Sequence, residues 1–290
     1  MSEFIGTKLT MNLGERSYDI IVKSGSLENL YQFARLDRRV AVVTDSGVPA
    51  QYAQMVADQC KDAHIITVPQ GEASKSFKIL ESVLKQMLEF GMGRGDLVIA
   101  VGGGVVGDLA GFAASIYMRG IDFINCPTTT LSMIDSSIGG KTAVDLGDTK
   151  NIVGAFWQPK LVIVDPDTLA TLPRRHFING LAEAVKASLL ADPELFAIFE
   201  NGDVDAQIGE IICRSLRFKK NIVEQDETEQ GMRKALNFGH TIGHGIEAVK
   251  GIKGRRTVGL YHGECVALGM LPMIESKALQ KRVRAVYRRL

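Results

Sequence analysis

Histidine side chains are concentrated in one part of the chain. Three of the five histidines, His240, His244 and His262, lie between positions 240 and 262. His240 and His244 are four residues apart, so a helix would place both imidazoles on one face. Histidine is the commonest metal ligand, and a catalytic zinc ion takes about three protein ligands and keeps one position open. The cluster therefore predicts a metal site, and the alternative is a group of hydrogen-bonded polar histidines.

A carboxylate that could complete this site is Glu183, in the apolar helical segment 180–186. An unpaired charge would be costly in such a segment, so either a metal ion or an ion pair with Lys186, three residues on, must neutralise it. Three histidines together with a semi-buried glutamate favour the metal. Cys265, one turn beyond His262, is either a fourth ligand or a small buried residue, which is the commoner role of cysteine.

A second pattern is the glycine-rich turn 102–108, which directly follows the apolar run 97–101. A strand, a glycine turn and a helix over 108–117 form the context in which backbone N–H groups cradle a pyrophosphate. Glycine permits positive φ and close approach there, and the helix N-terminus supplies partial positive charge. The glycines fit the G-x-G-x-x-G spacing, and a purely structural glycine turn is an equally good interpretation.

Two features depart from an ordinary dinucleotide-binding motif. The glycine turn follows the fourth predicted strand rather than the first, and no acidic residue closes the next strand about twenty positions downstream. Asp45 instead ends an earlier predicted strand, where its carboxylate could accept hydrogen bonds from ribose hydroxyls. The alternative role of Asp45 is to cap a helix N-terminus.

Basic side chains near these motifs indicate a pocket for an anionic substrate. A charged hydrogen bond contributes about 1.5–3 kcal/mol, so two or three of them would hold a phosphate or carboxylate group. With a formal net charge of only +1, solvated surface charge is the alternative for each residue. The candidates are Arg119, Lys141, Lys150, Lys219 and Arg233.

The elements that must position these residues change character at about Pro173. Before it, short apolar or β-branched runs alternate with helical periodicity, which is typical of a parallel sheet covered on both faces. The predicted strands are 18–23, 40–44, 64–68, 97–101, 123–126 and 161–164, and residues 76–90 carry a helical apolar stripe. After Pro173 only helices are predicted, over 178–190, 205–224, 232–249 and 263–279.

We therefore predict two domains. Residues 1–173 form an α/β domain with a mostly parallel, Rossmann-like sheet, and residues 174–290 form an all-helical domain. A chain of 290 residues with 46% hydrophobic residues is long and apolar enough for both.

Composition excludes several function classes. The 34 basic and 33 acidic residues leave no global field for nucleic acid or an acidic membrane surface. The four cysteines contain no C-x-x-C pair, which argues against a disulfide framework and fits a reducing cytoplasm. Residues 1–4 lack the pattern of a signal peptide, and no apolar run is long enough to span a bilayer. We expect a soluble, cytoplasmic protein.

Taken together, these segments closely resemble the 3-dehydroquinate synthase family. The resemblance runs in order from residue 69 to residue 265, and the combination of motifs is very specific. It is carried by Pro69–Glu72 with Lys75-Ser76, Gly102–Asp108 with Gly111-Phe112, Tyr117–Gly120, Pro127–Leu131, Asp135–Lys141, Lys150-Asn151, Gly154–Phe156, Ala182-Glu183 with Lys186, Leu236–His244 and His262-Gly263.

The resemblance implies an enzyme that depends on NAD and on a divalent metal, typically zinc with cobalt as an alternative. Its fold is an N-terminal α/β domain for NAD and a dehydroquinate synthase-like helical C-terminal domain for metal and substrate. The implied substrate is a sugar phosphate, 3-deoxy-arabino-heptulosonate 7-phosphate, which becomes 3-dehydroquinate and phosphate. NAD oxidises the C5 hydroxyl, phosphate is eliminated, the ketone is reduced again, and an aldol step closes the ring. Such lyases are usually homodimers of the shikimate pathway.

The resemblance also implies a role for individual residues. Glu183, His240 and His262 match the metal ligands, and His244 matches a substrate-contacting group of the proton chemistry, although its spacing alone would make it a ligand. Substrate-pocket positions are matched by Asp135, Lys141, Asn151, Lys186, Lys219, Arg233 and Asn237, and a phosphate-side position by Arg119. NAD-contacting positions are matched by Asp45, Glu72, Lys75, Gly102, Gly103, Gly104, Val105, Asp108, Thr128, Thr129, Lys141 and Lys150.

One departure from the family concerns the end of the chain. The family continues through further helices beyond the position of Leu290, so we expect a truncated helical domain and weakened activity. Three other functions stay open at this point: a related sugar-phosphate cyclase, a metal-dependent polyol dehydrogenase, and a non-catalytic protein that retains NAD.

Overall fold

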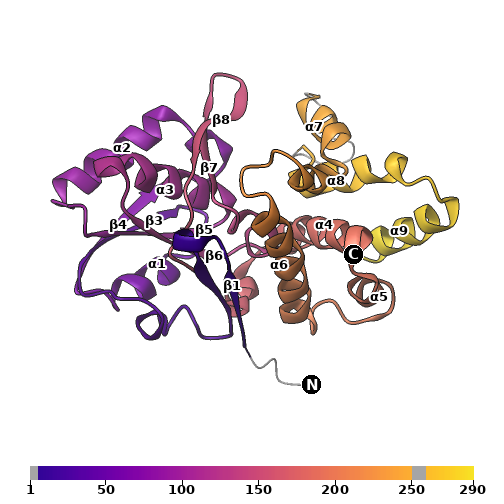
Figure 1. Cartoon of the computed structure of the whole chain (residues 1–290), viewed down its shortest axis with the longest axis horizontal. Helices are drawn as coiled ribbons and strands as arrows, with labels where there is room; N and C mark the ends of the chain where they lie inside the picture. Colours follow the sequence, from indigo (N-terminus) through magenta and orange to yellow (C-terminus); the bar gives the residue numbers. More distant parts are fainter. Residues whose placement is uncertain (1–5, 250–258) are drawn as a thin grey trace. The chain divides into compact units, whose positions relative to one another are not determined.

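The computed structural model describes residues 6–249 and 259–290. The N-terminal residues 1–4 and the loop 251–257, both considered in the sequence, lie outside the described residues. Internal contacts divide the chain into two units, an α/β unit that extends to Leu172 and a helical unit that runs from Pro173 to Leu290 (Figure 1).

The α/β unit is built on a seven-stranded sheet with the order β1-β2-β9-β6-β5-β3-β4. Within this sheet, β1 and β2 pair antiparallel and every other pair of neighbours is parallel, so the predicted mostly parallel sheet is confirmed. The strands are β1 Thr7–Met11, β2 Tyr18–Val22, β3 Arg39–Asp45, β4 Asp62–Val68, β5 Leu97–Gly102, β6 Asp122–Pro127 and β9 Leu161–Val164. All six predicted strands are present. The seventh, β1, is an edge strand whose polar residues hid it from the sequence analysis.

Both faces of this sheet are covered. Residues Val40 and Val42 of β3 pack on the side of α1 (Ala50–Ala57), while Ala41 and Val43 pack on the side of α2 (Phe77–Glu89) and α3 (Gly104–Ile116). Figure 1 shows α1 on one side of the strands and the other two helices on the opposite side. Because successive side chains of a strand point to opposite faces, a strand covered on both must be apolar throughout, as the sequence had indicated.

A two-stranded hairpin was not predicted. It consists of β7 (Lys141–Leu146) and β8 (Thr149–Phe156), which pair antiparallel and follow one another directly along the chain (Figure 1). Most of the β8 side chains are exposed, so the segment lacks the apolar run that marks a buried strand. A Cβ on Gly154 would lie 2.0 Å from the Thr142 carbonyl oxygen, which explains the glycine in this strand.

The helical unit contains no strand among its described residues, as predicted. Its helices are α4 Arg174–Ala191, α5 Pro193–Asn201, α6 Ile208–Gln225, α7 His240–Ala248, α8 His262–Met270 and α9 Lys277–Arg289. Shorter helical turns complete the chain: η1 Gly14–Arg16, η2 Leu30–Gln32, η3 Glu72–Ser74, η4 Tyr117–Arg119, η5 Ser132–Ser136, η6 Pro166–Thr171, η7 Met232–Asn237 and η8 Leu271–Met273. Within the described ranges, no helix combines the length and apolarity needed to cross a bilayer.

Two of the predicted helices are wrong as single elements. The predicted helix 232–249 is interrupted at Gly239, whose φ of 81° lies in the left-handed region and ends η7 before α7 begins. The predicted helix 263–279 is interrupted at Pro272, which has no N–H to continue the ladder, and Ser276 then caps α9 by accepting from the Leu279 N–H. The break at Gly239 places His240 at the start of α7.

Candidate metal and dinucleotide sites

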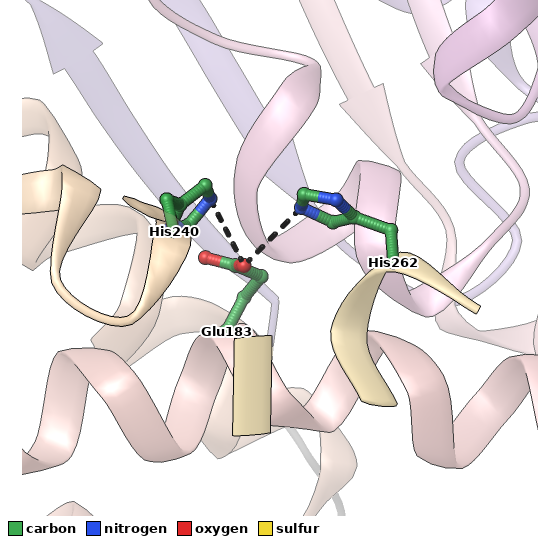
Figure 2. Close-up of side chains that lie close together, drawn as sticks. All are labelled: Glu183, His240 and His262. Carbon is green, nitrogen blue, oxygen red and sulfur yellow. Dashed lines mark ion pairs between the residues drawn. The ribbon is translucent and has the colours of Figure 1, made fainter. Parts of the chain in front are cut away.

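The glutamate and two of the histidines converge in the helical unit. Glu183 lies in the middle of α4, His240 is the first residue of α7, and His262 is the first residue of α8. The Nε2 atoms of His240 and His262 lie 3.6 and 3.8 Å from Glu183 Oε1. Figure 2 shows both imidazole rings turned toward that one oxygen. A single ion could therefore contact all three side chains.

The charge of Glu183 is only partly compensated by the chain. Its side chain is 2% exposed, and neither carboxylate oxygen accepts a hydrogen bond from a described residue. Lys186, one turn along α4, forms an ion pair with Oε2, while Oε1 faces the histidines. Glu183 can therefore have both of its predicted partners at once: the Lys186 ammonium pairs with Oε2, and a metal cation would bind Oε1.

The surroundings favour the protonation states that a metal site needs. Burial lowers the pKa of His240, against an opposing effect of the Glu183 charge, so the neutral, ligand-competent imidazole is favoured. Burial, with the Glu183 charge adding to it, raises the pKa of Tyr287 on α9, so its phenol stays protonated. Two imidazoles and one carboxylate form a donor set suited to zinc or cobalt, so the residues fit the implied ion.

One face of α4 fixes where α8 begins. Asn179 and Glu183 are one turn apart on this helix, and Asn179 Oδ1 accepts from the Gly263 N–H at 2.7 Å. A Cβ on Gly263 would lie 1.9 Å from the Asn179 carbonyl oxygen, so only glycine permits this approach. The contact places His262, the neighbour of Gly263, beside Glu183.

Arg175, one turn earlier on the same face of α4, holds the same helix start. Its guanidinium binds both oxygens of Glu264, at 2.8 and 2.9 Å, and lies 3.9 Å from the centre of the Tyr261 ring. Glu264 in turn accepts from the Tyr261 N–H at 2.9 Å. These contacts flank His262 on both sides in sequence and restrict its backbone.

The third histidine, His244, lies beside the other two. Its ring centre is 5.4 Å from that of His240 and 5.8 Å from that of His262. Glu247, a residue the sequence analysis missed, follows on the same face of α7, and its Oε2 lies 3.4 Å from His262 Nδ1. The spacing 240, 244 and 247 could have identified it, because these positions share one face of a helix.

Another carboxylate that was missed is Glu229. Its Oε1 accepts from Asn237 Nδ2 at 3.3 Å, and its backbone has a φ of 60°. A left-handed backbone at a non-glycine residue is uncommon and often marks a functional site. No spacing rule in the sequence points to it.

Two predicted substrate-pocket residues of the helical unit are buried rather than solvated. Lys219 on α6 is 8% exposed, and Arg233 in η7 is 1% exposed. The Arg233 guanidinium donates to the carbonyl oxygen of Glu227, and its backbone N–H donates to Asp226. The alternative of free surface charge is therefore wrong for both. Asn237, by contrast, is exposed.

The dinucleotide candidates lie at the carboxyl ends of neighbouring strands. In the sheet, β3 lies next to β5 (Figure 1). The strand that follows β3 along the chain, β4, lies on one side of this pair, and the strand that follows β5, β6, lies on the other side. The boundary between β3 and β5 is therefore the switch point of the sheet. Ligands of open α/β sheets bind at such points. Asp45 ends β3, Gly102 ends β5, and α3 begins at Gly104.

The structure contradicts the expected positive φ at the glycines of this turn, and their close packing agrees with the alternative of a structural glycine turn. None of the four at 102, 103, 104 and 107 adopts a positive φ. A Cβ on Gly102 would lie 2.7 Å from the Val106 side chain, and one on Gly104 would lie 2.9 Å from Ser136 Oγ. The glycines are therefore required for close packing. The helix also begins at Gly104, ahead of the predicted start at Asp108.

Side chains and backbone groups brace the loops around this turn. Asp45 Oδ1 accepts from the N–H groups of Gly47 and Val48, so it caps the turn that precedes α1. The Thr128 N–H donates to the Gly102 carbonyl at 2.9 Å, and Thr129 Oγ1 accepts from the Ser132 N–H at 3.2 Å. These bonds join the loops after β5 and β6.

Lys75 contacts two other predicted residues, Asp108 and Asn151. Its side chain is 4% exposed, and its Nζ lies 2.6 Å from Asp108 Oδ2 and also donates to Asn151 Oδ1. Its carbonyl oxygen accepts from the Asp145 N–H at 2.8 Å, so both ends of the residue hold the β7–β8 hairpin. Asn151 has a φ of 54°, a strained backbone that these contacts maintain.

The other predicted residues of the α/β unit are placed as follows. Lys141 and Lys150 are exposed on the hairpin, Glu72 is exposed at the start of η3, and Arg119 is exposed with a φ of 69°. Asp135 is half-buried in η5, and Gly103 and Val105 flank the start of α3.

The sequence matches family models and curated proteins over most of its length. A family model described as 3-dehydroquinate synthase N-terminal matches residues 65–179, and one described as 3-dehydroquinate synthase C-terminal matches residues 180–287. The 3-dehydroquinate synthase of Pelobacter propionicus is 43% identical over 276 residues, which cover 91% of this chain and 76% of that protein.

Two solved structures resemble the whole described chain. A 2-deoxy-scyllo-inosose synthase complexed with carbaglucose-6-phosphate, NAD+ and Co2+ has a TM-score of 0.85 and 27% identity, covering 97% of this chain and 81% of that chain. The 2-epi-5-epi-valiolone synthase from Streptomyces hygroscopicus subsp. jinggangensis 5008, with NAD+ and Zn2+ bound, has a TM-score of 0.82 and 30% identity, covering 96% and 81%.

The fold and these neighbours define an enzyme of the sugar-phosphate cyclase class. Both family models and the Pelobacter relative agree on one branch of that class. The chain belongs to the 3-dehydroquinate synthase family, so the resemblance seen in its motifs is confirmed.

Proposed function

We propose that the chain is a 3-dehydroquinate synthase, a lyase of the shikimate pathway that converts 3-deoxy-arabino-heptulosonate 7-phosphate into 3-dehydroquinate and phosphate. The observation that carries the proposal is the convergence of Glu183, His240 and His262 in a chain of this family. An NAD domain over residues 1–173 and a metal- and substrate-binding domain over residues 174–290 are part of the proposal.

The proposed cofactors each supply one kind of chemistry. Bound NAD provides a transient hydride acceptor, and a bound divalent cation provides Lewis acidity at the hydroxyl that is oxidised. Glu183, His240 and His262 would hold the cation. Support for both comes from the bound NAD+ with Co2+ or Zn2+ in the two structural neighbours. We take zinc as the native ion and cobalt as an active substitute.

The chain's own residues would bind the dinucleotide and the substrate. The N–H groups at the start of α3 would bind the pyrophosphate, because a helix N-terminus carries partial positive charge. Asp45, at the end of β3, and Lys75, directly after η3, would contact the rest of the dinucleotide. Lys186, Lys219 and Arg233 supply buried positive charge for the carboxylate and phosphate groups of the substrate.

His244 is the residue we propose for proton transfer. It lies beside both histidine ligands but is exposed, so it can reach a bound substrate without sharing the ion. Once the substrate C5 is a ketone, the neighbouring C–H is acidified, and its proton is removed as the phosphate leaves with the electron pair of the C–O bond. The ketone is then reduced again, and the opened ring closes by an aldol step.

Phosphate release from 3-deoxy-arabino-heptulosonate 7-phosphate tests the proposal. We expect wild-type protein to release phosphate without net NADH accumulation, and we expect chelation or the His240→Ala substitution to abolish release. Release that survives both treatments would remove the metal assignment.

Three further outcomes identify the alternatives. Release from sedoheptulose 7-phosphate or glucose 6-phosphate instead would indicate a related cyclase. Net NADH formation with glycerol would indicate a polyol dehydrogenase. Full NAD occupancy without metal or turnover would indicate a binding protein. We also propose a cytoplasmic homodimer, which cell fractionation and the mass in solution would test.

A further inference from the structure

We propose that Glu247 is a positioning residue that holds the His262 ring in the orientation and tautomer needed to bind the divalent cation. This inference rests on the proposed function, because it assigns a role toward the same ion. Glu247 was not among the residues identified from the sequence.

The His262 ring lies between two carboxylates. Its Nε2 is 3.8 Å from Glu183 Oε1, and its Nδ1 is 3.4 Å from Glu247 Oε2. A neutral imidazole carries a hydrogen on one nitrogen and a lone pair on the other. If Nδ1–H donates to Glu247, the lone pair of Nε2 faces Glu183 and His240. A carboxylate on the outer nitrogen of a ligating histidine is a common arrangement in metal sites, where it fixes the ring and raises its basicity.

The packing of α7 against α8 sets the distance between Glu247 and His262. A Cβ on Gly243 would lie 3.0 Å from the Cys265 carbonyl oxygen, and one on Gly269 would lie 2.2 Å from the Gly239 carbonyl oxygen. The two helices therefore approach to backbone contact. Glu247 is 24% and His262 32% exposed in their side chains, so solvent only partly screens the pair.

The outer nitrogens of the two proposed histidine ligands face different kinds of oxygen. The Nδ1 atom of His240 lies 3.3 Å from the Phe238 carbonyl oxygen, a backbone acceptor close in sequence. The Nδ1 atom of His262 lies 3.4 Å from Glu247 Oε2, a side-chain acceptor on a different helix. Each proposed ligand thus has an oxygen facing its outer nitrogen, and only the one at His262 can be removed by mutating a side chain.

Glu247 and His262 could instead bind a second cation together with His244. Ligand atoms of His244, Glu247 and His262 lie within 4.8 Å of one another. Such an ion would have to use the Nδ1 atom of His262, and binding two ions at once would require the neutral imidazole to lose its one N–H proton. The geometry therefore favours one ion with Glu247 behind its ligand, and the second ion is an outcome of the test.

The experiment is a Co2+ titration of the full chain after chelation, followed by the visible absorption of the bound ion. The variants are Glu247→Ala, which removes the acceptor, Glu247→Gln, which keeps an oxygen acceptor without the charge, and Glu275→Ala as a control. Glu275 is an exposed glutamate between η8 and α9. Nitrogen NMR of the histidine-labelled apo-protein reports the tautomer of His262.

We expect one Co2+ per wild-type chain. Glu247→Ala should weaken binding about 10–100-fold, change the absorption spectrum and lower the Nδ1–H fraction of His262. Glu247→Gln should lose less, because its amide oxygen still accepts from Nδ1–H, and Glu275→Ala should match wild type. Circular dichroism shows whether Glu247→Ala is folded, and if it is not, Glu247→Gln alone decides.

Wild-type affinity and tautomer in a folded Glu247 variant would overturn the proposal. Two ions per wild-type chain, with one lost in Glu247→Ala, would overturn it in favour of a second site. If wild type and His240→Ala both bound no Co2+, the proposed function itself would fail, and this result differs from every outcome that concerns Glu247 alone.

Discussion

The two candidate sites are assembled in different ways. In the α/β unit, the dinucleotide candidates follow the ends of neighbouring parallel strands, so the sheet itself brings them to one edge. In the helical unit, Glu183, His240 and His262 come from three different helices, of which α4 is far in sequence from α7 and α8. They meet only because specific polar contacts and glycines fix where each helix starts. One site depends on topology, and the other depends on individual packing contacts.

The largest expected effect is the removal of the shared carboxylate in the helical unit. Glu183→Gln should abolish cation binding and phosphate release, and it should destabilise the fold by about 3–5 kcal/mol because it leaves the buried Lys186 ammonium without its ion pair. Binding of NAD should not change. Metal content, NAD titration and urea denaturation measure the three effects.

The double variant Glu183→Gln, Lys186→Met separates the ion pair from the metal. It removes both buried charges, so stability should recover while cation binding stays lost. Recovery of cation binding in the double variant would show that Glu183 is not a ligand. Loss of NAD binding in either variant would show that the two sites are not independent.

The corresponding change in the α/β unit is Lys75→Met. It removes the ion pair with Asp108 and the hydrogen bond to Asn151, at a cost of about 1.5–3 kcal/mol of stability. We expect NAD to bind at least about tenfold more weakly, a difference of ~1.4 kcal/mol, while Co2+ affinity stays at the wild-type value. Titration with each ligand measures both.

Lys78→Met is the matched control for Lys75. Lys78 is exposed on α2, three residues along the chain, and its substitution should leave NAD binding unchanged. Equal losses in both variants would mean that net charge, rather than the contacts of Lys75, determines the affinity.

The contrast between the sites also explains what the sequence could predict. The most buried strands, such as β3 and β5, were identified because two apolar faces leave a continuous apolar run, whereas the largely exposed β8 leaves no such pattern. The three proposed ligands were identified by residue type and family resemblance. Their convergence is a tertiary property that no spacing encodes, since it depends on the contacts of Arg175 and Asn179 with the start of α8.

Helix ends were predicted less well than helix positions. The apolar periodicity of 232–249 continues through Gly239, so only the left-handed backbone at that residue reveals the break. Glu247 was missed for a related reason: its partner His262 belongs to another helix, and the spacing along α7 shows only that it shares a face with His240 and His244.

The smallest expected effect comes from the packing contact that places His262. Gly263→Ala would put a Cβ 1.9 Å from the Asn179 carbonyl oxygen, so α4 and α8 must separate. Overpacking of this kind costs about 1–3 kcal/mol, and we expect Co2+ affinity to fall with it because His262 moves away from Glu183. NAD affinity should not change.

Gly245→Ala on α7 is the control for this prediction. Nothing lies within 4 Å of a Cβ at this position, and alanine should stabilise the helix by about 0.5–1 kcal/mol. Gly263→Ala could instead lose stability but keep its Co2+ affinity. The approach of α4 and α8 would then matter for folding alone. The metal site would not depend on this packing contact, contrary to the comparison drawn above.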